Sequence, residues 1–334
     1  TLPYFSNATE LVFNFATNGL DWRNGARPVG LTVSTPDKLL TRFLPFGFAG
    51  GNLDEGQVKE WAASHQGLRG KKLTNANTRF DVHMAREWGV DLDELGCTFS
   101  DIQHTAALLD DHRKVFKLDK LIEDYLPELK VVMRVDETQH HQHHAAEVAE
   151  REKFTTEAVW RLRDVMYSEL DKQKLREIQQ TEDDVIPAVV EMEKNGSPID
   201  IELLDQFHRE CHAEHERLLL EISHECGFAF EHTASGWKRL LDHLNLATLD
   251  SYAEEMLNQV QHPLVCKGQL ASQHASLCSK VFDAYKKNVD ADGILHYNIN
   301  QLRGDEGGTV SGRFSIEYVQ QVPNNDNHMA TFGD

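Results

Sequence analysis

The chemistry of this chain is best approached from Asp81, which follows Asn77 and Phe80 near the start of a predicted helix. Cleavage of a phosphodiester is well served by two divalent ions about 4 Å apart, and magnesium prefers hard oxygen ligands such as carboxylates. Residues two apart on a strand point to the same face, so an Asp-x-Glu pair on a strand supplies two such ligands together. The apolar strand that ends near residue 19 carries Ala16 and Asn18 in that spacing, and alanine offers no ligand.

Hydrophobic periodicity predicts the elements that position these residues. Residues 10–34 alternate as a hairpin does, and an extended stretch at 73–77 leads into a helix from about Phe80. Residues 101–113 have helical spacing, so the first part is predicted to be mixed α/β. The segment 181–285 is predicted to be mostly helical, and strands and turns are expected again from residue 292.

These motifs resemble the 3′–5′ exonuclease domain of family A DNA polymerases, the bacterial polymerase I-like group. The first family motif, Phe-Asp-Thr-Glu-Gly, corresponds to Phe15-Ala16-Thr17-Asn18-Gly19. The second, Asn-x-x-Tyr/Phe-Asp, matches Asn77, Phe80 and Asp81. The third, Tyr-x-x-x-Asp opening a helix, falls on the stretch from Phe154 to Ala158.

The third motif has a competing placement, because Tyr167-Ser168-Glu169-Leu170-Asp171 matches its bare pattern literally. We place the motif at Phe154 and Ala158, since Val159-Trp160-Arg161-Leu162 continues the family helix. The resemblance then implies that every metal position except Asp81 has lost its carboxylate. Each 1.4 kcal/mol of lost transition-state stabilisation removes about a decade of rate, so the nuclease is expected to be inactive.

The second half resembles the polymerase itself. Residues 186–196, followed by Ile199-Asp200, are similar to the start of the polymerase region that leads into the thumb. Thr309-Val310-Ser311-Gly312-Arg313-Phe314-Ser315 and the later Gln320-Gln321-Val322-Pro323 resemble a family palm motif. The resemblance implies that Arg313 reaches the minor groove at the primer end and that Gln320 and Gln321 face the duplex. Minor-groove acceptors occur in every base pair, so such donors sense pair shape without choosing sequence. The implied nucleic-acid-binding residues are Asn77, Phe80, Ser311, Gly312, Arg313, Gln320 and Gln321.

The resemblance predicts an α/β ribonuclease H-like exonuclease domain at 1–175, a mainly helical thumb at 176–290 and the first strands of an α+β palm at 291–334. The implied function is template-dependent DNA synthesis by a DNA-directed DNA polymerase. Its implied cofactor is Mg²⁺, and its implied partners are primer–template DNA, a single-stranded 3′ end and deoxynucleoside triphosphates. The catalytic aspartates of the family palm are not recognisable in this sequence, so the remaining polymerase part is expected to be missing from it.

Composition limits these readings. A chain of 334 residues suits two or three domains, but a formal net charge of −20 opposes non-specific DNA coating and requires a local basic groove. No run of about 18 apolar residues and no signal peptide is recognisable, so a membrane span is not expected. The five cysteines are scattered without a C-x-x-C pair, which favours a reducing cytoplasm over a disulfide framework or a zinc site.

Other interpretations remain open. The tract His140-His141-Gln142-His143-His144 suits a transition metal, but it is more simply a solvated loop, with no Asp or Glu expected at helical spacing. The tract also hints at a phage or other divergent member of the family. The first part is alternatively a ribonuclease H-like domain that never cleaved, with Asp81 an ordinary helix N-terminal carboxylate. A ribonuclease D-like exonuclease with a helical accessory domain, or a non-catalytic module that binds DNA ends, are the alternative functions.

Overall fold

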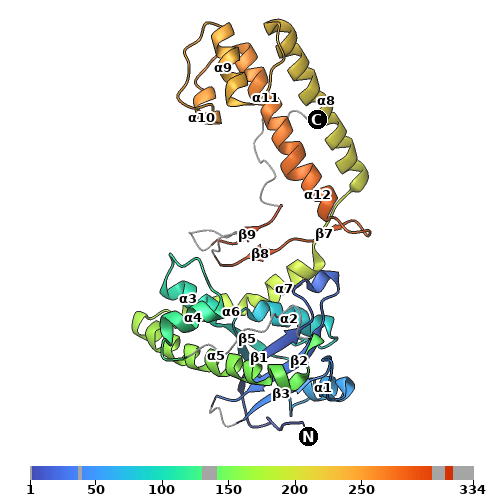
Figure 1. Cartoon of the computed structure of the whole chain (residues 1–334), viewed down its shortest axis with the longest axis vertical. Coiled ribbons are helices and arrows are strands. Elements are labelled where there is room, and N and C mark those ends of the chain that lie inside the picture. Colours follow the sequence, from blue (N-terminus) through green and yellow to red (C-terminus); the bar gives the residue numbers. More distant parts are fainter. Residues whose placement is uncertain (1, 37–39, 130–140, 303–312, 319–334) are drawn as a thin grey trace. The chain divides into compact units, whose positions relative to one another are not determined.

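The computed structural model describes residues 2–36, 40–129, 141–302 and 313–318 (Figure 1). The chain divides into a first unit, Thr1–Met192 with Asn300–Ser315, and a second unit, Glu193–Ile299 with Ile316–Asp334. The predicted division at residues 175 and 290 into nuclease, thumb and palm stays a prediction. Within the described residues, no helix is both long and apolar enough to cross a bilayer.

The first unit is built on a five-stranded sheet in the order β3-β2-β1-β4-β5. Strand β1 runs antiparallel to β2, as β2 does to β3, whereas β1, β4 and β5 are parallel. The predicted hairpin at 10–34 is confirmed, with Phe13 opposite Val33 and the short helix η1 (Trp22–Asn24) in its loop. The strands are β1 (Glu10–Thr17), β2 (Pro28–Ser34), β3 (Thr41–Pro45), β4 (Lys72–Asn75) and β5 (Thr98–Asp101).

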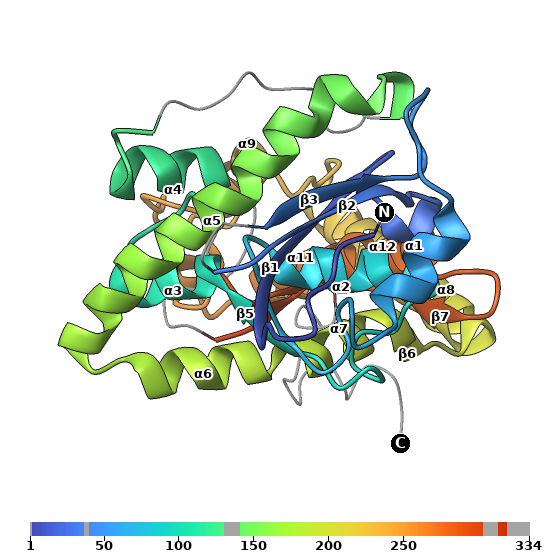
Figure 2. The same cartoon turned by 90° about the horizontal axis from the view of Figure 1, so that it is seen from below.

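Helices cover both faces of this sheet, because alternate residues of β1 are buried on opposite sides. Phe13 and Phe15 belong to one apolar cluster, together with Trp61 and Met84 of α1 and α2. Val12 packs on the other face, which α5 crosses diagonally (Figure 2). The helices of this unit are α1 (Glu55–Ala62), α2 (Thr78–Glu87), α3 (Ile102–Leu109), α4 (Leu118–Tyr125), α5 (Ala145–Gln173) and α6 (Arg176–Asp184).

Helix α5 corrects two expectations. The third motif was expected to open a helix near Phe154, but α5 already begins at Ala145 and runs unbroken for 29 residues. It begins there because the Nδ1 atom of His144 accepts a hydrogen bond from the backbone N–H of Ala146 and so caps the helix. The expectation of no acid at helical spacing in the histidine tract was also wrong, since His143 Nδ1 lies 3.1 Å from Glu147 Oε2 one turn later.

The structure confirms that the segment 181–285 is mostly helical. Helix α8 runs between Asp200, whose carboxylate accepts from the backbone N–H of Leu203, and Gly227 in the left-handed conformation. Strands β6 and β7 pair with each other, as do β8 and β9. From the last helix before this unit onward, the elements are α7 (Ile186–Asn195), β6 (Ser197–Pro198), α8 (Ile201–Cys226), α9 (Ala234–His243), α10 (Glu254–Leu257), α11 (Pro263–Leu277), the π-helix η3 (Cys278–Phe282), α12 (Asp283–Asn288), β7 (Ile294–Leu295), β8 (Ile299–Asn300) and β9 (Ser315–Ile316).

Trp237 of α9 belongs to an apolar cluster of the second unit and packs against α11 at Gly268. A methyl group on Gly268 would lie 2.5 Å from Cη2 of Trp237 and 2.9 Å from its Cζ3. The indole is 5% exposed and has little room to move away. Gly268 therefore sets how closely α11 and Trp237 approach.

We expect Gly268→Ala to lower the free energy of unfolding by about 1–3 kcal/mol, because the added methyl group overpacks this contact. Gly56→Ala, in α1, is the matched control, since the added methyl group there meets only a side-chain oxygen of Asp54 at 3.3 Å. That control should be neutral or stabilise by up to about 1 kcal/mol through helix propensity. Denaturant titration of both variants measures the difference, and equal stabilities would contradict the close-packing assignment.

Candidate functional site

Asp81 lies in the first turn of α2, where it is 2% exposed. Its Oδ1 accepts a hydrogen bond from the backbone N–H of Phe15 at 2.9 Å, and its Oδ2 accepts one from Asn75 Nδ2 at 2.6 Å. Phe15 is on β1, and Asn75 ends the neighbouring parallel strand β4. The carboxyl group is therefore held at the carboxyl ends of two adjacent strands.

A second acid, Glu152 of α5, joins this site through two amides. Asn14 Nδ2 donates to Glu152 Oε2 at 2.9 Å, and Asn75 Nδ2 lies 3.2 Å from Asn14 Oδ1. Thr32 of β2 adds a longer contact to the same Glu152 oxygen, at 3.5 Å. We call Asn14, Asn75, Asp81 and Glu152 the amide–acid cluster.

Asn14, Asn75 and Glu152 were not among the residues predicted for the site. One signal for Glu152 was available. On α5 it falls in a stripe of buried residues at helical spacing, between Val148 and Thr156, and it is itself 3% exposed. An acid in an otherwise buried stripe is unusual unless it is paired, so this position deserved consideration as a site residue.

The predicted metal positions do not meet in the amide–acid cluster. Ala16 is buried against Ala145 and Val148 of α5. Asn18 is exposed, and its Oδ1 accepts a hydrogen bond from the backbone N–H of Arg27 at 2.7 Å. Ala158 belongs to a different apolar cluster, which contains Val12 and includes Phe154 at its margin. The structure thus brings Asp81 together with Glu152 rather than with Ala158.

The predicted DNA-binding residues of the first unit lie beside the amide–acid cluster. Asn77 is exposed and has a left-handed backbone conformation (φ 67°, ψ 48°), and its side chain does not cap α2. Phe80, in the first turn of α2, is partly buried against the apolar cluster that contains Phe13 and Phe15. Of the predicted duplex contacts, Arg313 is exposed. Ser311, Gly312, Gln320 and Gln321 lie outside the described residues.

Burial dominates the electrostatics of Asp81. Desolvation, with a smaller contribution from the charges of Asp101 and Glu152, raises the pKa of this carboxyl group to about 8, against the hydrogen bonds from Phe15 and Asn75. Asp81 is therefore largely neutral at pH 7. A neutral carboxyl group is a poor ligand for a divalent ion.

The residues present do not fit a two-ion site. Ala16 offers only a methyl group, Asn18 already uses its amide oxygen within the hairpin, and both acids are bonded to neighbouring amides. Asn75 Oδ1 is a buried oxygen with no hydrogen-bond partner in the structure. Among the described residues, no group of three or more His, Cys, Asp or Glu side chains is arranged to hold a metal ion.

The raised pKa of Asp81 predicts a pH-dependent stability. Its folded-state pKa of about 8 lies above the ordinary value of 3.8, so the free energy of unfolding should fall as pH rises from about 4 to 8. Asp81→Asn removes this titration, so the melting temperature of the variant should increase relative to that of the wild type as the pH rises across that range. Asp54→Asn, at the exposed N-cap of α1, is the control for loss of a carboxylate. A difference that does not grow between pH 5 and 8.5 in thermal denaturation would contradict the burial of an uncompensated acid.

No protein-family model matches the chain. Its sequence is 26% identical to the DNA polymerase DpoZ of Salmonella phage PMBT28 over 98% of the chain, and 24% identical to that of Acinetobacter phage SH-Ab 15497, also over 98%. The chain spans 57% and 58% of the lengths of these two relatives.

The fold is similar to that of the polymerase domain of Pol1 from M. smegmatis, solved in complex with DNA primer–template and dNTP. The TM-score is 0.71 at 17% identity, and the match covers 95% of this chain and 53% of the Pol1 chain. The comparison with Pol1 rests on the arrangement of helices and strands, whereas the comparison with the phage polymerases rests on sequence alone. Together they confirm the resemblance that the motifs predicted: the chain is similar to phage DNA polymerases along nearly its whole length and has a polymerase I-like fold.

Proposed function

We propose that the chain is the exonuclease-like, thumb and palm-start portion of a DNA-directed DNA polymerase, a nucleotidyltransferase that extends a primer on a DNA template. The observation that carries this proposal is the similarity to two phage DNA polymerases over 98% of the chain. The relatives are considerably longer, so primer extension, deoxynucleoside triphosphate use and magnesium dependence are proposed for the whole polypeptide. The divisions at residues 175 and 290 belong to the same proposal.

The first unit is proposed to be ribonuclease H-like. The order β3-β2-β1-β4-β5, with β1 antiparallel to β2 and parallel to β4, supports this assignment. The amide–acid cluster also supports it, because ligand sites in open α/β sheets lie outside the carboxyl ends of parallel strands. Asp81 is bonded to β1 and β4 at that edge.

We propose that the proofreading centre of this unit is inactive and that Glu152, rather than Ala158, is its remaining third-motif acid. The contact from Glu152 to Asn14 on β1 supports this placement. Ala158 instead packs with Val12 and Trp160 among apolar side chains. The loss is then confined to the strand positions Ala16 and Asn18, and the amides of the cluster donate hydrogen bonds to the two acids that remain.

The strand substitutions provide a direct test. The double variant Ala16→Asp/Asn18→Glu should degrade single-stranded DNA from its 3′ end in Mg²⁺ at a rate at least roughly a hundredfold above the wild type, since metal stabilisation is worth several kcal/mol. The same variant should gain melting temperature when MgCl₂ is added, while the wild type should not. Gel analysis of a labelled oligonucleotide and thermal denaturation measure the two effects.

Two further variants test which acid takes part. Adding Glu152→Gln to the double variant should abolish both effects. Adding Ala158→Asp should give no further gain, because Ala158 packs with Val12 and Trp160, whereas Glu152 contacts Asn14. A gain of activity that needs Ala158→Asp and is indifferent to Glu152→Gln would refute the Glu152 assignment.

We also propose that the surface beside the amide–acid cluster, which carries Asn77, binds a single-stranded 3′ end without cutting it. Asn77 supports this role, because an exposed residue other than glycine held at φ 67° is uncommon and such conformations gather at functional sites. Phe80 lies one turn along the same helix, and an aromatic ring there offers a face on which a base can stack.

The proposed duplex contact of Arg313 is tested with the chain itself. Arg313→Ala should weaken primer–template binding by about 1–3 kcal/mol if the guanidinium donates to base edges in the minor groove. Arg217→Ala, on α8, is the control for loss of an exposed guanidinium, which there is paired with Glu214 and Glu221. Fluorescence anisotropy at several salt concentrations measures both, and equal losses in the two variants would contradict a specific role for Arg313.

A further inference from the structure

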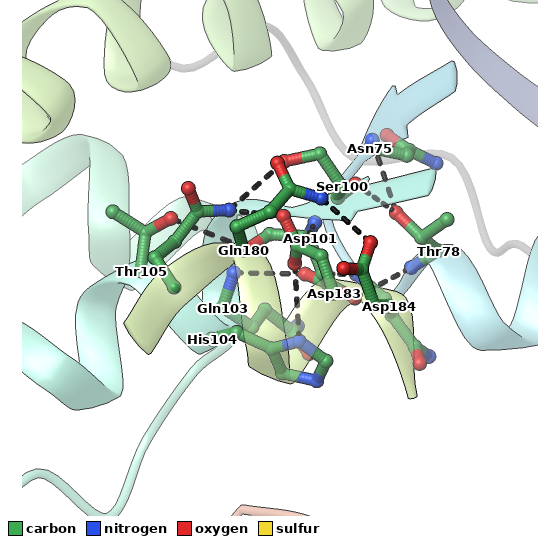
Figure 3. A network of polar contacts seen from close by, with 12 residues as sticks. Asn75, Thr78, Ser100, Asp101, Gln103, His104, Thr105, Gln180, Asp183 and Asp184 are labelled. Carbon is green, nitrogen blue, oxygen red and sulfur yellow. Dashed lines mark hydrogen bonds and ion pairs between the residues drawn. The ribbon is translucent and has the colours of Figure 1, made fainter. Parts of the chain in front are cut away.

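A buried acid network lies beside the turn that carries Asn77. Asp101, 3% exposed, ends β5 and caps α3 through the backbone N–H of Gln103 at 2.8 Å. The same carboxylate also reaches across to α2, where it accepts from the backbone N–H of Asn77 at 3.1 Å and of Thr78 at 2.7 Å. Figure 3 shows Asp101 between Thr78 and Gln103. One carboxylate therefore binds the first N–H groups of two helices.

A second acid, Asp183 of α6, bonds to the backbone of Asp101. Asp183 is fully buried, and its Oδ1 accepts the backbone N–H of Asp101 at 3.0 Å and lies 3.3 Å from His104 Nδ1 (Figure 3). Its other oxygen accepts from Gln179 Nε2, which also donates to Ser100 Oγ at 3.3 Å. The end of β5 is thus fastened to α6 by buried, charge-assisted hydrogen bonds.

We infer that Asp101 is a positioning residue that stabilises the left-handed conformation of Asn77 and so presents this side chain to a single-stranded DNA end. This inference rests on the proposed DNA-end binding beside the amide–acid cluster. Asparagine enters the left-handed region more readily than most residues other than glycine, and hydrogen bonds from the N–H groups of Asn77 and Thr78 favour this conformation of the turn. The Asp101 carboxylate accepts both bonds, and the side chain of Asn77 does not itself cap α2.

The inference assigns Asp183 a supporting part. It bonds the backbone of Asp101 rather than the turn, and so fixes where the Asp101 carboxylate can point. Helix α6 thereby contributes to the placement of a turn in a distant part of the sequence, between β4 and α2. No side chain of α6 has to touch DNA for this effect.

The two duties of Asp101 can be separated by substitution. Asp101→Ser keeps a good N-cap for α3 but has a side chain too short to bond the N–H groups of Asn77 and Thr78 as well. Asp101→Asn keeps the shape and removes the charge, and serves if the serine variant does not fold. Asp54→Asn, a carboxylate N-cap on α1 of the same unit, is the matched control.

A local measurement distinguishes a positioning role of Asp101 from a merely stabilising one. Amide hydrogen exchange at Asn77 and Thr78 should accelerate by roughly tenfold or more in the Asp101 variants, with exchange at Gln103 unchanged in Asp101→Ser, because a hydrogen bond to a charged group is lost only at the turn. Binding of a short single-stranded oligonucleotide without metal, followed by anisotropy, should weaken about as much as in Asn77→Ala. Asp54→Asn should change neither.

The outcomes distinguish the two levels of inference. Failure of the wild type to bind single-stranded DNA refutes the proposed DNA-end function, and the exchange rates then still decide whether Asp101 holds the turn. Unchanged exchange at Asn77 and Thr78 in a folded Asp101 variant refutes the positioning role. Faster exchange combined with full DNA affinity also refutes it, because the held conformation would then not serve binding.

Discussion

Buried carboxyl groups need partners, and this requirement shapes the first unit. Asp81 and Glu152 lie at 2% and 3% exposure on either side of Asn14 and Asn75. An isolated ionised carboxylate in such a place would be very costly, so it either binds a cation, bonds to neighbouring donors or takes up a proton. Here amide donors contact both acids, and the raised pKa of Asp81 shows that protonation carries part of the compensation.

The same requirement acts in a different form at the end of β5, where Asp101 lies opposite Asn75 of β4. Asp101 and Asp183 are compensated by backbone N–H groups at a helix start and at a strand end. Backbone donors are fixed by the fold, so these hydrogen bonds lock the elements together. The compensation in the amide–acid cluster determines whether its acids can bind a metal ion, whereas the Asp101 network determines where the turn between β4 and α2 lies.

The comparisons fit the proposed loss of nuclease activity on a retained scaffold. Sequence identity to the phage polymerases is only 26% and 24%, yet the similarity runs through 98% of the chain. Strand β1 keeps its apolar face against α1 and α2, and its other face still receives α5. Ala16 and Asn18 fit these packing surfaces, because Ala16 packs against α5 and Asn18 bonds within the hairpin.

Much of the fold was predictable because its signals are local. Alternation predicted the β1–β2 hairpin. Asp200 and Gly227 cap the two ends of α8, and capping depends only on residues next to the helix. Asp81 was also found from its motif. The partner acid was not, because α5 is one long helix whose sequence permits several registers. Only the path of α5 across the sheet decides that Glu152 meets Asn14 while Ala158 meets Val12. Contacts between residues 138 positions apart depend on helix placement, which no local pattern encodes.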